Sequence, residues 1–231
     1  MVGRAWGVTG LLVAIALCEF LPGLAPAQEY RVDKLAEAAP AEGLAEEIRN
    51  ELASEGIKVI KGTSRTFVDF WPAKKWAAKA DFTATNAILY PFQVGELIGV
   101  IRYKSKGTDF RGQEIKSGVY TVRYALQPED GNHVGTSDTR DFLLLLPIES
   151  DTSPAAVDQE QLFKLSAEVA GTPHPAMLAL QKANSGAESL PAIEHNEERE
   201  LYSLLFQGTA DAGGKTSELP VQVVVVGQAA E

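Results

Sequence analysis

The sequence predicts a mostly β fold: an antiparallel β-sandwich, jelly-roll or immunoglobulin-like, with one or two flanking α-helices. Residues 119–126 alternate with a period of two, so that Tyr120, Val122, Tyr124 and Leu126 share one apolar face. Residues 142–146 are apolar on both faces, which is typical of a strand covered on both sides. Six or more short strand-like runs with turn signals between them follow residue 56, as in an all-β sandwich.

The first 27 residues predict a secretory signal peptide. Arg4 supplies a short positive region, residues 10–17 are almost wholly apolar, and Ala25-Pro26-Ala27 places small residues where signal peptidase requires them. Cleavage is expected after Ala27. The protein is therefore expected to be exported, to a periplasm or to the extracellular space.

A permanent membrane anchor is not expected after cleavage. The apolar run is shorter than the roughly 20 residues that span a bilayer, and Glu19 follows it directly after Cys18. Lipid attachment at Cys18 is the alternative. It is disfavoured because Leu17 stands where a lipoprotein signal has a small residue.

The composition limits the partners. The formal net charge of −10 argues against nucleic acid, which binds clustered Lys and Arg. Cys18 is the only cysteine, so the mature chain has no disulfide and depends on its hydrophobic core. The expected partner is an envelope ligand or protein of unknown identity, and no cofactor is expected.

The chain is expected to divide into a signal peptide (1–27), a linker with an N-terminal helix (28–55) and a β-sandwich domain (56–231). Residues 41–55 predict the helix, because Leu44, Ile48 and Leu52 repeat every four residues. A second helix is expected near residues 154–170, with Ser153 as its cap and Pro154 in its first turn.

The remaining segments are predicted from alternation and turn residues. Residues 177–180 are compatible with helix or strand, 183–196 with an exposed loop, and 208–220 with a long polar hairpin loop. Strands are expected at 57–60, 66–71, 76–82, 88–92, 97–103, 119–126, 142–146, 201–206 and 221–226.

Specific catalytic motifs are absent from the sequence. It contains no GxSxG elbow, Walker loop, HExxH or paired CxxC. These absences lower the expectation of an enzyme, although many hydrolases carry no local signature.

The densest polar cluster lies between the two strands of residues 119–146. Connections of about a dozen residues exceed the usual hairpin length, and such loops often bind ligands. His133 with Asp130 or Asp138 could hold a divalent metal, completed by His174 or His195. Alternatively the acids form turns and Arg140 pairs with Asp141. The candidate residues here are Glu129, Asp130, His133, Asp138, Arg140 and Asp141.

Two further candidates are aromatic and histidine segments. Trp71 and Trp76 could stack against sugar rings; alternatively one fills the core while the other covers a sheet edge. In Thr172-Pro173-His174-Pro175 the two prolines could present the His174 imidazole, or the segment could simply turn the chain after a helix.

Residues 107–147 resemble a family of uncharacterised exported bacterial proteins. The shared pattern is GVYT-x-RY-x-LQP followed by DGNH and RDF-x-LL-x-P, matched here from Gly118 to Pro147. The resemblance extends weakly across the mature chain, including residues 170–176. It implies a signal peptide, a short helix and a β-rich domain, and it implies no activity.

The sequence therefore supports two hypotheses. The first is an exported cell-envelope binding or interaction protein without catalytic activity, whose ligand is a carbohydrate or another protein. It predicts exposed aromatic rings at Trp71 and Trp76 or an apolar surface patch. The second is a secreted, metal-assisted hydrolase that uses the Asp130–Asp141 loop, and it predicts that His133, Asp138 and His174 converge in one pocket.

Overall fold

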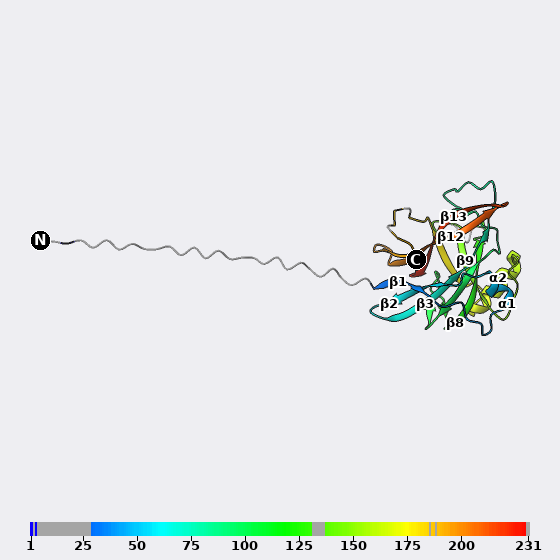
Figure 1. The fold of residues 1–231 in the computed structure, drawn as a ribbon, viewed down its shortest axis with the longest axis horizontal. Coiled ribbons are helices and arrows are strands. Elements are labelled where there is room, and N and C mark those ends of the chain that lie inside the picture. Colours follow the sequence, from blue (N-terminus) through cyan, green and yellow to red (C-terminus); the bar gives the residue numbers. More distant parts are fainter. Residues whose placement is uncertain (2, 4–28, 131–136, 185, 188, 230–231) are drawn as a thin grey trace.

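The structure of the chain is a computed structural model (Figure 1). It describes Met1, Gly3 and residues 29–229, apart from 131–136, 185 and 188. The predicted signal peptide, with its cleavage site and Cys18, lies outside the described residues except for Met1 and Gly3. In the described part of the chain, no helix is long and apolar enough to cross a membrane.

The prediction of a mostly β fold with flanking helices is confirmed. The described residues form two helices, α1 (Glu46–Glu51) and α2 (Gln159–Ala170), and thirteen strands. The strands are β1 (Tyr30–Leu35), β2 (Gly56–Lys61), β3 (Arg65–Pro72), β4 (Trp76–Ala77), β5 (Leu97–Tyr103), β6 (Gly107–Thr108), β7 (Glu114–Ile115), β8 (Gly118–Leu126), β9 (Asp141–Pro147), β10 (Met177–Gln181), β11 (Ala192–Asn196), β12 (Leu201–Ala212) and β13 (Lys215–Val226).

One curled sheet makes up the body of the domain. Its order is β1-β2-β3-β5-β8-β9-β10-β13-β12-β11, with every neighbour antiparallel, while short β4 pairs in parallel with β12. Strand β10 links the two halves, because residues 177–179 pair with β9 and residues 180–181 pair with β13. The first and last parts of the sheet approach each other, and the rings of Tyr30 and Tyr202 lie 4.6 Å apart.

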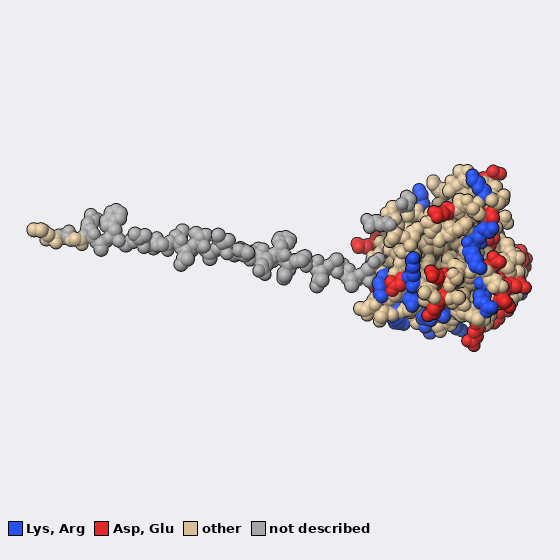
Figure 2. Space-filling model, viewed as in Figure 1, with Lys and Arg blue, Asp and Glu red and all other residues tan. Residues whose placement is uncertain are grey.

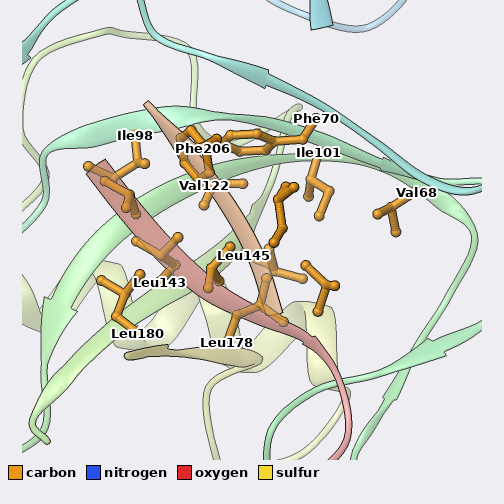
Figure 3. Packing of buried hydrophobic residues seen from close by; sticks show 14 of the residues in the cluster. Val68, Phe70, Ile98, Ile101, Val122, Leu143, Leu145, Leu178, Leu180 and Phe206 are labelled. Atoms are coloured by element: carbon orange, nitrogen blue, oxygen red, sulfur yellow. The ribbon is translucent and has the colours of Figure 1, made fainter. Parts of the chain in front are cut away.

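The main core lies between the two halves of the sheet. Phe70 of β3 packs edge-on against Phe206 of β12, with ring centroids 5.0 Å apart (Figure 3). Val122 and Leu143 of β8 and β9 contribute to the same cluster, as the alternation of residues 119–126 predicts. The inward faces of the strands thus form one continuous apolar interior.

The outer face of β8 and β9 is also covered. Leu162 and Leu165 of α2 pack against Ala125 and Leu144. Ile48 of α1 belongs to a separate cluster over β3 and β5. The two helices therefore cover different parts of the outer face, and this explains why residues 142–146 are apolar on both sides.

A fully buried ion pair fastens the segment after β9 to the sheet. The guanidinium of Arg123 donates to both carboxylate oxygens of Asp151, each at 2.7 Å, and Thr121 donates to one of them at 2.5 Å. Arg123 also donates to the carbonyls of Gly95 and Ala155, at 2.7 and 2.9 Å. Every donor of this buried cation is directed at an oxygen, so the network holds residues 151–155 in place.

The prediction for residues 28–55 was wrong in two respects. The expected linker contains β1, which pairs with β2 along its whole length. The expected helix over 41–55 is only α1, Glu46–Glu51, because Gly43 has a φ of +74° and Leu52 has extended backbone. Leu44 and Leu52 are buried, but they reach the core from outside the helix.

The second helix starts later than predicted. Asp158, rather than Ser153, caps α2: its carboxylate accepts from the amides of Glu160 and Gln161, both at 3.1 Å. Ser153 lies in the segment whose carbonyls Arg123 holds, so its backbone is committed elsewhere.

The segments after α2 contain more strand than predicted. Residues 201–226 form one hairpin with a two-residue turn, not strands joined by a long loop, because Gly213 and Gly214 take φ values of +65° and +91°. The expected loop at 183–196 contains β11, and residues 177–180 are extended as β10. Of the strands expected at 76–82 and 88–92, only β4 and an isolated bridge at Phe92 form.

Candidate binding site

An apolar hollow lies between α2 and the outer face of the sheet, and we call it the α2 hollow. Its volume is about 220 Å³. Its apolar walls come from three strands, the helix and three prolines: Ala125, Leu126, Pro128, Phe142, Leu144, Phe163, Pro173, Pro175 and Met177. The remaining lining residues are Arg111, Gln127 and His174.

The position of the α2 hollow follows from where α2 ends. Gly171 caps the helix with a φ of +65°, a conformation that glycine adopts at little cost, and the chain then turns back toward β10. Ser166 of the helix donates its hydroxyl to the carbonyl of Ala176 at 3.0 Å and accepts the Ala176 amide at 3.2 Å through its own carbonyl. The short Thr172–Pro175 segment is therefore tied to the helix at its far end.

Buried Asp109 fixes the segment that carries Arg111. Its carboxylate accepts from the backbone amides of Arg111 and Gln113 at 2.9 and 2.8 Å, and from the Gln113 side chain at 2.8 Å. It also accepts from the amide of Met177 at 3.1 Å. Asp109 thus joins the 109–113 turn to β10, one wall of the α2 hollow.

Gln113 joins the two segments at the rim. Its amide nitrogen donates to the carbonyl of Pro175 at 3.0 Å, and its amide oxygen accepts from the hydroxyl of Thr172. The backbones that carry Arg111 and His174 are therefore connected through one side chain. The imidazole of His174 is exposed and lies at the rim of the α2 hollow.

Asp141 is a structural acceptor rather than a loop ligand. It is buried at the start of β9 and accepts from the amides of Leu89 and Tyr90 at 2.8 and 3.2 Å and from the hydroxyl of Tyr124 at 2.7 Å. Burial raises the pKa of the Asp141 carboxyl, an effect that these hydrogen bonds oppose. The expected pair with Arg140 is not formed, because Arg140 contacts Glu129 instead.

The structure separates the other predicted site residues. Asp138 pairs with Arg199 and lines a second, more polar hollow of about 400 Å³ beside β10 and β11, whereas His174 lines the α2 hollow. His195 stacks on Tyr202, with ring centroids 4.0 Å apart.

The structure bears only partly on the predicted metal site. His133 lies outside the described residues, and Asp130 is described and exposed. Among the residues that the structure describes, no group of three or more His, Cys, Asp and Glu side chains could hold a metal.

Neither Trp71 nor Trp76 offers a ring to a sugar. Trp71 and Trp76 are both 0% exposed. The indole nitrogen of Trp71 donates to the carbonyl of Glu37 at 2.7 Å, and that of Trp76 donates to the carbonyl of Ile98 at 2.9 Å. The prediction of exposed stacking rings was wrong, because Trp76 is buried in the main core and Trp71 is buried in the cluster beneath α1.

Known proteins provide no relative from which a role of the α2 hollow could be inferred. No family model, curated protein or solved structure matches the chain. Sequence reasoning had singled out His174 but missed Arg111 and Phe163. The signal for Arg111 was available in Asp109-Phe110-Arg111-Gly112-Gln113, where an Asp two residues before the Arg can accept its backbone amide in a turn.

Proposed function

We propose that the protein is an exported envelope protein that binds a small, largely apolar ligand in the α2 hollow and does not transform it. The observation that carries this proposal is the apolar wall between α2 and the sheet. Concave apolar sites with a few polar groups at the edge are the usual form of a small-molecule site. The backbone amides of the rim residues Arg111 and His174 donate to the side chains of Asp109 and Thr172, which hold the rim in place.

An apolar ligand fits this hollow better than a carbohydrate. Sugar hydroxyls need hydrogen-bonding partners, and nine of the twelve lining residues are apolar. The buried rings of Trp71 and Trp76 remove the stacking surface on which the carbohydrate hypothesis depended.

A hydrolase is the second candidate and receives less support. A general base must lie within hydrogen-bond reach of its partner. Within the described residues, Asp138 is engaged by Arg199, Asp141 by the backbone amides of Leu89 and Tyr90, and His174 lines a different hollow from Asp138. Binding without chemistry is therefore the function we propose.

Export is the second element of the proposal, together with membership of the exported bacterial family that residues 118–147 resemble. It is supported by the signal-peptide pattern of residues 1–27 and by the start of β1 at Tyr30, close behind the expected cleavage site. The mixture of basic and acidic side chains on the face in Figure 2 and the net charge of −10 support a partner other than nucleic acid.

The N-terminal sequence of protein purified from its native cells tests export. We expect it to begin at Gln28, because signal peptidase would cut after Ala27. A chain that begins at a lipid-modified Cys18 would instead show a lipoprotein, and a chain that retains residues 1–27 would contradict export.

Binding of octan-1-ol tests the proposed site. A dry cavity of about 150 Å³ holds the six carbons of benzene, so the α2 hollow, at about 220 Å³, suits about nine heavy atoms in the same proportion. Burial of the alkyl chain at ~0.8 kcal/mol per methylene gives a Kd on the order of 0.1 mM. Saturable binding in this range supports the proposal, and absence of saturation at millimolar ligand contradicts it.

A further inference from the structure

The rim of the α2 hollow carries charge of one sign. Among the described residues that line it, Arg111 and His174 are the two titratable ones, both are nitrogen bases, and none is Asp or Glu. The protein as a whole is acidic, with a formal net charge of −10. A cationic rim on an acidic protein attracts a negatively charged group to this opening.

The Arg111 guanidinium is available to a ligand. Within the described part of the chain its side chain is exposed and forms no ion pair. Five other arginines already hold carboxylates in this structure: Arg31 with Asp33, Arg102 with Asp69, Arg123 with Asp151, Arg140 with Glu129 and Arg199 with Asp138. Arg111 lies instead beside an apolar hollow whose described lining residues include no Asp or Glu.

Hydrogen bonds within the chain hold the backbone on both sides of Arg111 in place. Asp109 accepts the amide of Arg111, and the amide of the preceding Phe110 donates to the carbonyl of Met177 at 2.8 Å. Gln113 ties the same turn to Pro175, next to His174. A prearranged cation loses less freedom on binding than one on a mobile loop, which favours recognition of a charged head group.

From this juxtaposition we infer that the ligand is a small amphipathic monoanion: an apolar chain or ring that ends in a single carboxylate. The inference rests on the proposed binding function. The apolar part occupies the walls formed by Leu144, Phe163 and Met177, and the carboxylate lies at the rim, where Arg111 donates to it in the bidentate geometry that suits a guanidinium. A single negative charge matches the single permanently charged side chain of the rim.

Calorimetric titration of the whole chain with octanoate and octan-1-ol at pH 7 tests this inference. The two probes share the alkyl chain and differ in the head group. We expect octanoate to bind roughly tenfold more tightly at low salt, a difference typical of a partly exposed charge-assisted pair, and the advantage to shrink as salt rises.

Two matched arginine variants locate the effect. Arg111→Gln is expected to bring octanoate to parity with octan-1-ol. Arg65→Gln removes the same charge from an exposed position that does not line the hollow, and it is expected to keep the octanoate advantage. Both positions are exposed, so neither substitution should compromise folding.

The outcomes separate this inference from the proposed function. If both probes bound saturably and with equal affinity, the inference of a monoanionic ligand would be wrong, and the proposed apolar site would still stand. Loss of the octanoate advantage in Arg65→Gln as well as in Arg111→Gln would show a general charge effect and would also overturn the inference. Failure of both probes to bind would remove the site itself, and the inference with it.

Discussion

The Arg123→Met variant is expected to lose about 3–5 kcal/mol of its free energy of unfolding, the loss typical when one partner of a buried ion pair is removed. Asp151 would lose its cationic partner in a site where only 3% of its surface is exposed. Two of the hydrogen bonds to its carboxylate come from the guanidinium that is lost, and the carbonyls of Gly95 and Ala155 would lose donors as well.

A double variant distinguishes the cost of a lone charge from the value of the pair. Arg123→Met combined with Asp151→Leu removes both charges, and we expect it to be more stable than Arg123→Met alone. Urea denaturation followed by circular dichroism provides the measurement, with exposed Arg65→Gln as a control that should change stability by less than about 0.5 kcal/mol. A loss below about 1 kcal/mol in Arg123→Met would contradict the buried network.

The Trp76→Ala variant is also expected to lose about 3–5 kcal/mol of its free energy of unfolding, as is typical when a buried aromatic side chain is truncated. The indole packs against Phe92 and Phe206, with ring centroids 5.4 and 6.1 Å away. It also occupies the space above Gly208, where a Cβ atom would lie only 2.1 Å from the ring. Removal leaves a cavity in the interior and the Ile98 carbonyl without its indole donor.

The stability of Trp76→Phe and the binding of glycans serve as controls for this prediction. Trp76→Phe retains part of the ring volume and should lose less stability than Trp76→Ala in the same urea titration. Neither variant should change sugar binding specifically, because the unaltered ring is buried. A Trp76→Ala protein of unchanged stability that loses affinity for a glycan would contradict the interior position of this residue.

The strands that follow simple alternation were predictable. Val122 and Tyr124 face the core as their spacing requires, and the doubly apolar 142–146 segment is covered on both faces. Strand β1 could not be predicted in this way because its charged side chains hide the pattern. The strand forms because β2 offers a partner along its whole length, and residues 30–35 alone do not reveal that partner.

The prediction of a long loop within residues 201–226 was wrong for a different reason. The half of the hairpin near its turn has few large apolar side chains, so its low hydrophobicity predicted a loop, whereas backbone pairing continues to the Gly213-Gly214 turn. The two glycines were the available signal, since a two-residue turn of this type needs positive φ at both positions.

The candidate site was predictable only in part. His174 was identified from the two prolines around it, but the partner that fixes its segment, Gln113, is 61 positions away in the sequence. Trp71 and Trp76 could not be assigned to the interior from composition, because a sheet with two covered faces has room for rings on either side. Arg123 was missed because the alternation of residues 119–126 identifies one apolar face and gives no sign that the opposite face, which carries Arg123, is also buried.

The methyl resonance of Met177 during titration with octan-1-ol tests the proposed binding site most directly. The sequence has two methionines, Met1 and Met177, and the proposed mature protein, which begins at Gln28, retains Met177 alone; labelling of its methyl group then gives one signal, and its loss in Met177→Leu verifies the assignment to the α2 hollow. We predict that the Met177 signal moves saturably with the same Kd as the calorimetric titration. In Ala125→Leu, which adds side-chain volume to the hollow wall, the shift should be weaker. A Met177 signal that stays in place while octan-1-ol binds, or that shifts equally in Ala125→Leu, would contradict binding in this hollow.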